Sequence, residues 1–422
     1  MLDRHRVPAA CSAALAAFTL SLAARAQYIG PEPPPEVEPW YEAIELRAFA
    51  DAYAAVNYEF PKPQDGKNQL RAFDRTNGFA LSWVGLDASY EPEPVGATVS
   101  LRFGPTAEVF ARDDAAFGLT PVKQAFASWK PRFGDSPLRL DFGKFDSIYG
   151  AEAAESQDNI NYTRGALFTL IQPWFHTGLR ATLQLSEALA LRALAVNGWN
   201  NSVDNNAGKS FGAQVEYTPT RRFRLKLGWL GGPEQDDTTV VSCAAAERYS
   251  AATGTCVPDP SVAAADDFTV DRGGANELDA WRHLVDLTAD FQTERLYLGL
   301  NAAYVTEGQR AADHLSDEVT RRSYYAGMLG ARFALTEAWA VAGRAEYLRD
   351  PDGAVLGAGD DGGLVTGTLT IEAKPTDQLI LRLDNRADLM LSGDDEDVFA
   401  EDLRSRTDRQ LTTTLGVVIT TP

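Results

Sequence analysis

The chain has 422 residues, with 39 Lys plus Arg, 59 Asp plus Glu and a formal net charge of −20 at pH 7. A chain this acidic repels phosphate, so the composition excludes a nucleic-acid-binding protein. Because 45% of the residues are hydrophobic and 10% are aromatic, the composition also excludes a disordered chain.

Residues 1–26 have the pattern of a bacterial signal peptide. Arg4 and Arg6 lie in a basic start, residues 9–22 are apolar or small, and Ala24 and Ala26 fit a cleavage site. We therefore predict that the chain is exported and that its mature form begins at Gln27. The Pro-rich residues 27–43 are then expected to form a periplasmic segment before the first strand.

The rest of the chain alternates between apolar and polar residues, and no stretch reaches the roughly 18 apolar residues of a membrane helix. In residues 44–58, the even positions from Ile44 to Tyr58 are apolar, whereas the odd positions include Glu45 and Asp51. One face of such a strand suits hydrocarbon and the other suits water.

This alternation predicts sixteen strands, near residues 44–58, 79–90, 97–104, 121–130, 137–145, 175–185, 188–197, 210–218, 222–230, 280–291, 295–305, 322–334, 338–349, 364–374, 378–390 and 408–420. Seven of the connections are short turns, and the other eight are long loops that alternate with them. Residues 44–422 are therefore predicted to be all-β, a transmembrane antiparallel β-barrel with both ends in the periplasm. A soluble β-sandwich also has alternating strands, but its turns do not divide into two length classes.

The third long loop, residues 146–174, contains the apolar segment 165–171. Apolar loop residues need a place to be buried, and the lumen of a sixteen-stranded barrel is wide enough to leave an aqueous channel. We therefore expect the loop to fold inward as a constriction. The alternative is an additional strand over residues 161–172.

The polar faces of the strands are expected to point into the lumen and to carry more arginines than carboxylates. These charges either pair with one another or bias conduction, as charged rings do in channels. The predicted pore constriction consists of loop carboxylates and wall arginines, namely Glu152, Glu155, Asp158, Arg102, Arg139 and Arg180.

Cys243 and Cys256 are the two cysteines left after Cys11 departs with the signal peptide. In an exported chain, two cysteines this close in sequence predict a local disulfide, here in the long loop 231–279. A metal site would need more ligands nearby. No metal, cofactor or catalytic residue is predicted, so the chain is not expected to be an enzyme.

Several segments resemble the OmpL-like beta-barrel porin family. They are residues 49–58 (FADAYAAVNY), 68–74 (NQLRAFD), 103–107 (FGPTA), 140–145 (LDFGKF), 175–180 (FHTGLR) and 196–206 (VNGWNNSVDNN). The resemblance is dense from about residue 45 to 220, and it implies a channel in the bacterial outer membrane. The chain differs from such barrels in its C-terminus, because it ends at Pro422 rather than on an aromatic residue.

These observations favour a porin that lets small hydrophilic solutes and ions diffuse passively. Its expected partners are outer-membrane lipid, lipopolysaccharide and those solutes, with a homotrimer as a possible assembly. Two alternatives stay open. One is a non-conducting barrel whose acidic extracellular loops bind a surface partner, and the other is a substrate-selective channel.

Overall fold

The computed structural model describes residues 39–60, 68–133, 136–272, 274, 276–310, 318–357, 360–392, 398–400 and 406–421. The chain divides into two units, Met1–Ala43 and Ile44–Pro422. In the first unit, the described part contains a short 3-10 helix, η1 (Trp40–Ala43). The predicted signal peptide and most of the Pro-rich segment 27–43 lie outside the described residues.

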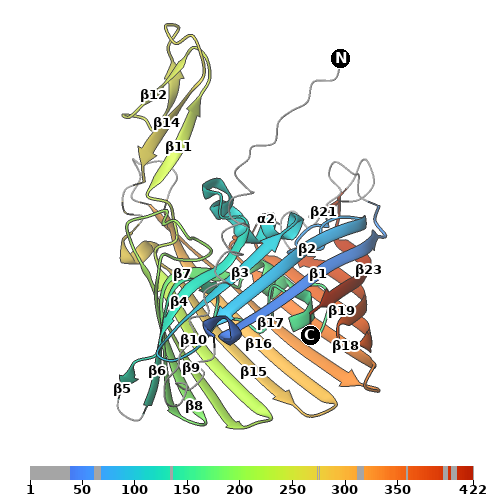
Figure 1. Ribbon diagram of the computed structural model, residues 1–422. Coiled ribbons are helices and arrows are strands. Elements are labelled where there is room, and N and C mark those ends of the chain that lie inside the picture. Colours follow the sequence, from blue (N-terminus) through green and yellow to red (C-terminus); the bar gives the residue numbers. More distant parts are fainter. Residues whose placement is uncertain are drawn as a thin grey trace, which may run out of the picture. The chain divides into compact units, whose positions relative to one another are not determined.

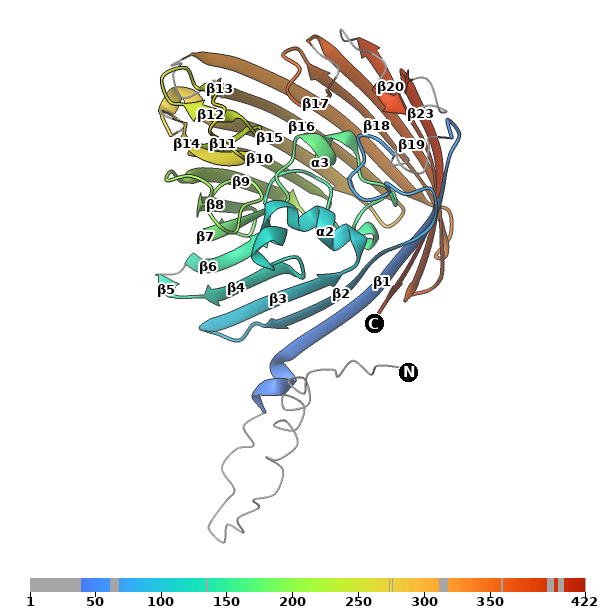
Figure 2. The same cartoon turned by 90° about the horizontal axis from the view of Figure 1, so that it is seen from above.

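The second unit is a closed antiparallel β-barrel (Figures 1 and 2). Its strands are β1 (Ile44–Asn57), β2 (Gly78–Tyr90), β3 (Val95–Phe103), β4 (Val122–Trp129), β6 (Ser136–Asp146), β7 (Phe175–Ser186), β8 (Leu189–Val196), β9 (Ser210–Thr220), β10 (Phe223–Gly232), β15 (Arg282–Gln292), β16 (Leu296–Arg310), β17 (Val319–Ala334), β18 (Trp339–Asp350), β19 (Gly362–Thr376), β20 (Leu379–Ser392) and β23 (Arg409–Thr420). Each strand pairs with the next, and β1 pairs with β23 to close the ring. Closure matters in a membrane because it leaves no unpaired strand edge.

The sixteen predicted strands are confirmed, with ends that differ by a few residues. A seventeenth, two-residue strand, β5 (Arg132–Phe133), pairs only with the start of β6. Strands β16 and β17 extend further than the alternation predicts, to Arg310 and from Val319, so the loop between them is shorter than expected. The tight turns lie at one end of the barrel and the long connections at the other (Figure 1).

The predicted side-chain register of β1 is also confirmed. Asp51 is 0% exposed on the inner face, and Phe49 and Tyr53 are buried on the same face. On the outer face of the barrel, large apolar side chains are exposed, such as Leu329 at 62%. The barrel therefore presents an apolar exterior, as a membrane requires.

The long connections contain further elements that the alternation did not predict. These are α2 (Pro105–Ala111), η2 (Arg112–Phe117), η3 (Ser156–Asp158), α3 (Ala166–Leu170), η4 (Leu278–Ala280), and the short strands β11 (Thr238–Cys243), β12 (Glu247–Ser250), β13 (Thr255–Pro258), β14 (Asp266–Asp271), β21 (Phe399–Ala400) and β22 (Arg406–Thr407). Among the described residues, no helix has the length and apolar character needed to cross a membrane.

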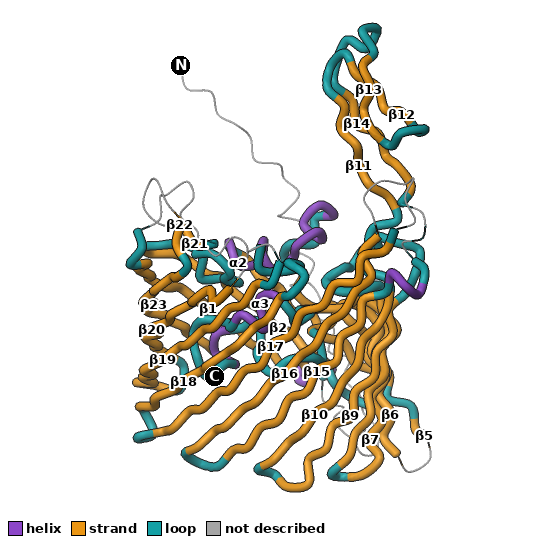
Figure 3. Tube along the Cα trace, turned by 180° about the vertical axis from the view of Figure 1, so that it is seen from behind, coloured by secondary structure: helices purple, strands orange, loops and turns teal. Residues whose placement is uncertain are grey.

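Strands β11 to β14 form a hairpin that projects away from the barrel (Figures 1 and 3). β11 pairs with β14, and β12 pairs with β13. The predicted disulfide between Cys243 and Cys256 is confirmed. The rings of Tyr249 and Phe268 stack with their centroids 5.8 Å apart.

The lumen of the barrel is partly filled with apolar side chains. Seen from above, α2 and α3 lie inside the ring of strands (Figure 2). Phe110 of α2 and Phe168 of α3 belong to a buried cluster with the wall residues Phe49, Trp83 and Phe175. Wall positions that face these helices are therefore apolar, which differs from the uniformly polar inner face that we expected.

Candidate functional site

The loop between β6 and β7 crosses the lumen and is bound to the wall on several sides. The backbone nitrogen of Gly150 donates to Asp286 of β15 at 2.9 Å, and that of Thr163 donates to Asp384 of β20 at 2.8 Å. The backbone nitrogen of Leu167 donates to Glu346 of β18 at 3.0 Å. In residues 161–172 the structure has the helix α3, so the alternative of an additional strand there is wrong.

The loop carboxylates predicted for the constriction have different surroundings. Glu152 lies 2.5 Å from the Arg344 guanidinium, and both side chains are largely buried. Glu155 lies 2.7 Å from Arg102 and 2.9 Å from Lys123. Asp158 is exposed and forms no ion pair with a described residue. Among the six predicted residues, Glu155 and Arg102 are the one loop carboxylate and wall arginine that the structure pairs.

Arg139 and Arg180 do not meet the loop carboxylates. Both bind Asp141 of β6, through Arg139 Nε at 2.7 Å and Arg180 Nη2 at 2.8 Å, and Arg139 also binds Glu91. These two arginines were predicted from the face of the strand alone. Residues on the same face can still lie at different heights along the barrel axis, so they need not meet. Cross-strand register decides that Asp141 is opposite Arg180.

Most of the inward arginines pair with a wall carboxylate in the same manner. These pairs include Arg192–Glu216, Arg224–Asp290, Arg282–Glu307, Arg332–Glu372, Arg382–Glu372 and Arg386–Asp388. Of the two interpretations of the inward charges, mutual pairing accounts for these arginines.

Two loop anchors were not predicted. Asp51 of β1 accepts hydrogen bonds from Ser156 Oγ at 2.6 Å and from Tyr162 Oη at 2.7 Å. Their signal in the sequence was weak, because Asp51 looked like any inward polar residue and Ser156 and Tyr162 lie in a segment without periodicity. Together they hold the loop close to β1.

Three cavities border the inward loop and share lining residues. A cavity of about 610 Å³ lies at the end with the long connections, and a second of about 480 Å³ shares Arg112, Thr169 and Leu170 with it. A third cavity, of about 350 Å³, shares Trp174 with the first and Gln172 with the second. Its lining also contains residues of the wall further from the mouth, namely Arg192, Gln214 and Lys226. The three cavities therefore adjoin one another beside the inward loop.

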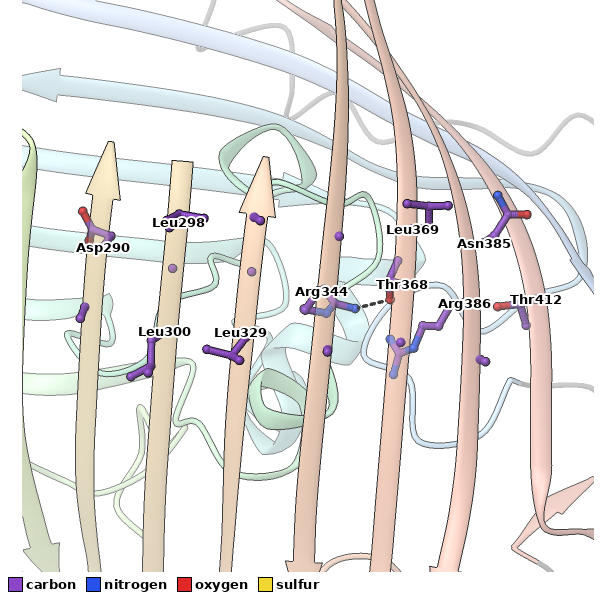
Figure 4. A pocket seen from close by; sticks show the side chains of 18 of the residues that line it. Asp290, Leu298, Leu300, Leu329, Arg344, Thr368, Leu369, Asn385, Arg386 and Thr412 are labelled. Atoms are coloured by element: carbon purple, nitrogen blue, oxygen red, sulfur yellow. Dashed lines mark hydrogen bonds between the residues drawn. The ribbon is translucent and has the colours of Figure 1, made fainter. Parts of the chain in front are cut away.

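A further hollow, of about 1040 Å³, lies on the outer face across β15 to β20 and β23 (Figure 4). Its lining includes exposed leucines such as Leu329 and Leu369, and small residues such as Ala345. The polar group Asn385 accepts a hydrogen bond from Thr413 Oγ1 at 2.9 Å there. The exposed apolar side chains of this hollow lie on the outer face, and none of its lining residues lines the three cavities beside the inward loop.

In the described part of the chain, no group of three or more His, Cys, Asp or Glu side chains could hold a metal ion.

A model of the family described as Putative beta-barrel porin-2, OmpL-like, matches residues 43–420. No curated protein matches the chain. Among solved structures, outer-membrane expressed OmpT of Vibrio cholerae is similar, with a TM-score of 0.54 and 12% identity over 90% of this chain and 97% of that chain. An anion-selective porin from Comamonas acidovorans gives a TM-score of 0.51 and 12% identity over 90% and 99%. Pseudomonas putida OprB gives 0.54 and 12% over 90% and 95%. At these identities the likeness concerns the fold.

Proposed function

The chain belongs to the OmpL-like beta-barrel porin family and is located in the bacterial outer membrane, and from this premise we propose that small hydrophilic solutes and ions diffuse passively through its lumen. The proposal requires no catalytic residue and no cofactor. Lipid and lipopolysaccharide would surround the apolar outer face. One similar structure is OmpT of Vibrio cholerae in a trimer form, and a homotrimer is our proposal for this chain as well.

The observation that carries the proposal is the series of cavities beside the inward loop. The cavities begin at the end with the long connections and reach side chains of β8, β9 and β10. Their lining is rich in guanidinium, amide and carboxylate groups, which can replace the hydration of a polar solute. An apolar solute would have to displace bound water without replacing its hydrogen bonds. The path should therefore favour hydrophilic solutes.

Gln172 is a suitable residue to test this path, because it lies where two of the cavities adjoin. Its side chain lines two of the cavities, and its Nε2 donates to the Glu152 carbonyl at 3.1 Å. Gln172→Trp should lower single-channel conductance in planar bilayers by at least twofold, because the indole fills the junction. Gln172→Ala should raise it.

The matched control is Gln378→Trp, in the tight turn between β19 and β20 at the other end of the barrel. This variant should conduct like the natural protein. A natural protein that refolds but passes no ions would contradict the proposal. Equal conductance in all four proteins would place the path elsewhere.

The second candidate function is surface binding through the projecting hairpin. The observation that favours it is the distance to which β11–β14 extends beyond the barrel mouth (Figure 3). Conduction by a variant without the hairpin separates the two functions, since a porin does not need it.

A further inference from the structure

The 610 Å³ cavity at the barrel mouth has an unusual charge balance for so acidic a chain. Three arginines line it, Arg71, Arg75 and Arg112, and no carboxylate does. The rest of the lining consists of amide, hydroxyl and apolar side chains: Asn68, Gln69, Leu70, Thr169, Leu170, Trp174 and Val355. The cavity is thus both cationic and partly apolar.

Only one of the three guanidinium groups, that of Arg71, is paired with carboxylates of described residues. Arg71 is buried and binds Asp74 at 2.8 Å and Asp388 at 2.7 Å. Arg75 uses its Nε for the Arg71 carbonyl at 3.0 Å and has no carboxylate partner among the described residues. The Arg112 guanidinium forms no hydrogen bond or ion pair with any residue that the structure describes. Two guanidinium groups therefore remain available to a ligand.

The backbone of Arg112 is in a strained conformation. Arg112 has φ 49° and ψ −128°, at the junction of α2 and η2. This is a region that glycine adopts easily and that residues with a side chain avoid, and such outliers gather at functional sites. The Arg112 guanidinium lies 4.2 Å from the centroid of the Trp174 ring, which gives a cation–π contact but no counter-charge.

The charges near Arg112 are mostly of its own sign. Partial burial lowers the pKa of the Arg112 guanidinium, the cations Arg75 and Arg282 lower it further, and Asp113 raises it. A bound anion would relieve this repulsion. A planar carboxylate suits guanidinium groups especially well, because two parallel N–H donors match its two oxygens.

We propose that this cavity binds small organic carboxylates, with the carboxylate on Arg75 and Arg112 and the apolar body against Trp174, Leu170 and Val355. The proposal rests on the proposed function, because it assigns a class of solute to the same path. Inorganic anions lack the apolar body and would use only half of the lining. The cavity would therefore prefer an aromatic or branched carboxylate to phosphate or chloride.

Binding of benzoate to the refolded full chain in detergent, measured by isothermal titration calorimetry, tests the site directly. Benzoate should bind at least tenfold more tightly than benzamide, which has the same shape without the charge, and more tightly than inorganic phosphate. Arg112→Gln and Arg75→Gln should each weaken benzoate binding by at least tenfold, since charge-assisted hydrogen bonds are the strong ones. Arg112→Lys should recover only part of the affinity.

The matched control is Arg222→Gln, an exposed arginine of the tight turn between β9 and β10 with no side-chain partner among the described residues. It makes the same charge change at the other end of the barrel and should bind benzoate like the natural protein. Equal affinities for benzoate and benzamide in the natural protein would overturn the proposal, and this comparison needs no variant. Unchanged binding in a folded Arg112→Gln protein would overturn it too.

Conductance in potassium chloride, measured on the same preparations, separates this proposal from the porin function. Benzoate should reduce the chloride current of the natural protein and have less effect on Arg112→Gln. A barrel that conducts chloride but does not bind benzoate would remain a porin without this site. A barrel that binds benzoate but does not conduct would have the site without the porin function.

Discussion

Glu234 is a carboxyl group of the barrel mouth whose charge should change near neutral pH. It follows β10 and accepts hydrogen bonds from the backbone nitrogen of Trp199 at 2.8 Å and from Ser210 Oγ at 2.6 Å. Burial raises its pKa to about 7, although Arg282 acts to lower it. The charged groups that line the same cavity are Arg112, Asp113, Asp236, Arg282, Glu307 and Arg322.

The sign of the pH effect follows from this raised pKa. Glu234 is neutral below about pH 7 and negative above it, so the cavity gains a negative charge as the pH rises. Anion preference, measured as the reversal potential in a potassium chloride gradient, should be greater at pH 6 than at pH 8. The folded state should also lose stability as the pH rises from 4.5 to about 7, because it binds more protons than the unfolded chain there.

Glu234→Gln should show, at both pH 6 and pH 8, the reversal potential that the natural protein has at pH 6. Asp236→Asn, in the same cavity, is the control that removes a charge and should keep the pH dependence. If the reversal potential of Glu234→Gln still changed with pH as in the natural protein, another group would be titrating.

Single residues also mark the limit of what the sequence could predict. Asp51 was placed on the inner face by alternation alone, and it lies there. Arg139 and Arg180 were placed on the correct face but with the wrong partners, because a period of two gives the face and not the height. Arg112 could not be found at all, since its strained backbone and its open guanidinium appear only in three dimensions.

At the scale of elements, we expect the inward loop to depend on the ion pairs of Glu155, the residue directly before the short helix η3. Glu155 is 4% exposed and lies between Arg102 and Lys123, whereas Asp158 at the other end of η3 is exposed. Glu155→Gln removes the carboxylate that Arg102 and Lys123 share, although Asp87 stays with Arg102 and Asp146 with Lys123. Because removing the sole partner of a buried charge costs about 3–5 kcal/mol, Glu155→Gln should lower the free energy of unfolding by less than that, about 1–3 kcal/mol. Asp158→Asn should change the free energy of unfolding by less than about 0.5 kcal/mol.

Urea unfolding of both variants in lipid vesicles measures this difference, and protease cleavage within residues 147–174 reports whether the loop is released. Glu155→Gln should be cleaved faster than Asp158→Asn. Equal unfolding and equal cleavage would mean that the hydrogen bonds of Asp51 and Asp384 hold the loop without Glu155.

The strands were predictable because a wall between hydrocarbon and water imposes a period of two on every one of them. The helices α2 and α3 and the hairpin β11–β14 were not, because they lie in connections where no solvent boundary imposes a period. The apolar residues of 165–171 gave the one usable sign, since a loop cannot leave them exposed. Whether this loop limits conduction stays a prediction.

For the whole molecule, the net charge and the charge of the cavity have opposite signs. The chain carries −20, yet the cavity at its mouth is lined by arginines without carboxylates. Exposed charges act over a distance that salt controls, about 30 Å at 0.01 M and about 3 Å at 1 M, while charges inside a cavity are screened less. The acidic exterior should therefore oppose anion entry at low salt and lose this effect at high salt.

The projecting hairpin allows this opposition to be measured. Thr238 and Asp271 pair at its base, so a two-residue Asn-Gly turn can replace residues 239–270 without disturbing the barrel. The replacement removes four carboxylates, Glu247, Asp259, Asp266 and Asp267, and one cation, Arg248. The ratio of anion to cation permeability should rise in this variant at 0.01 M salt and match the natural protein at 1 M.

Changing the same four carboxylates to amides within an intact hairpin should have the same effect, because charge and not bulk is responsible. A rise that persists at 1 M salt would mean that the hairpin obstructs the mouth physically, and a loss of all conduction would make the hairpin part of the channel itself.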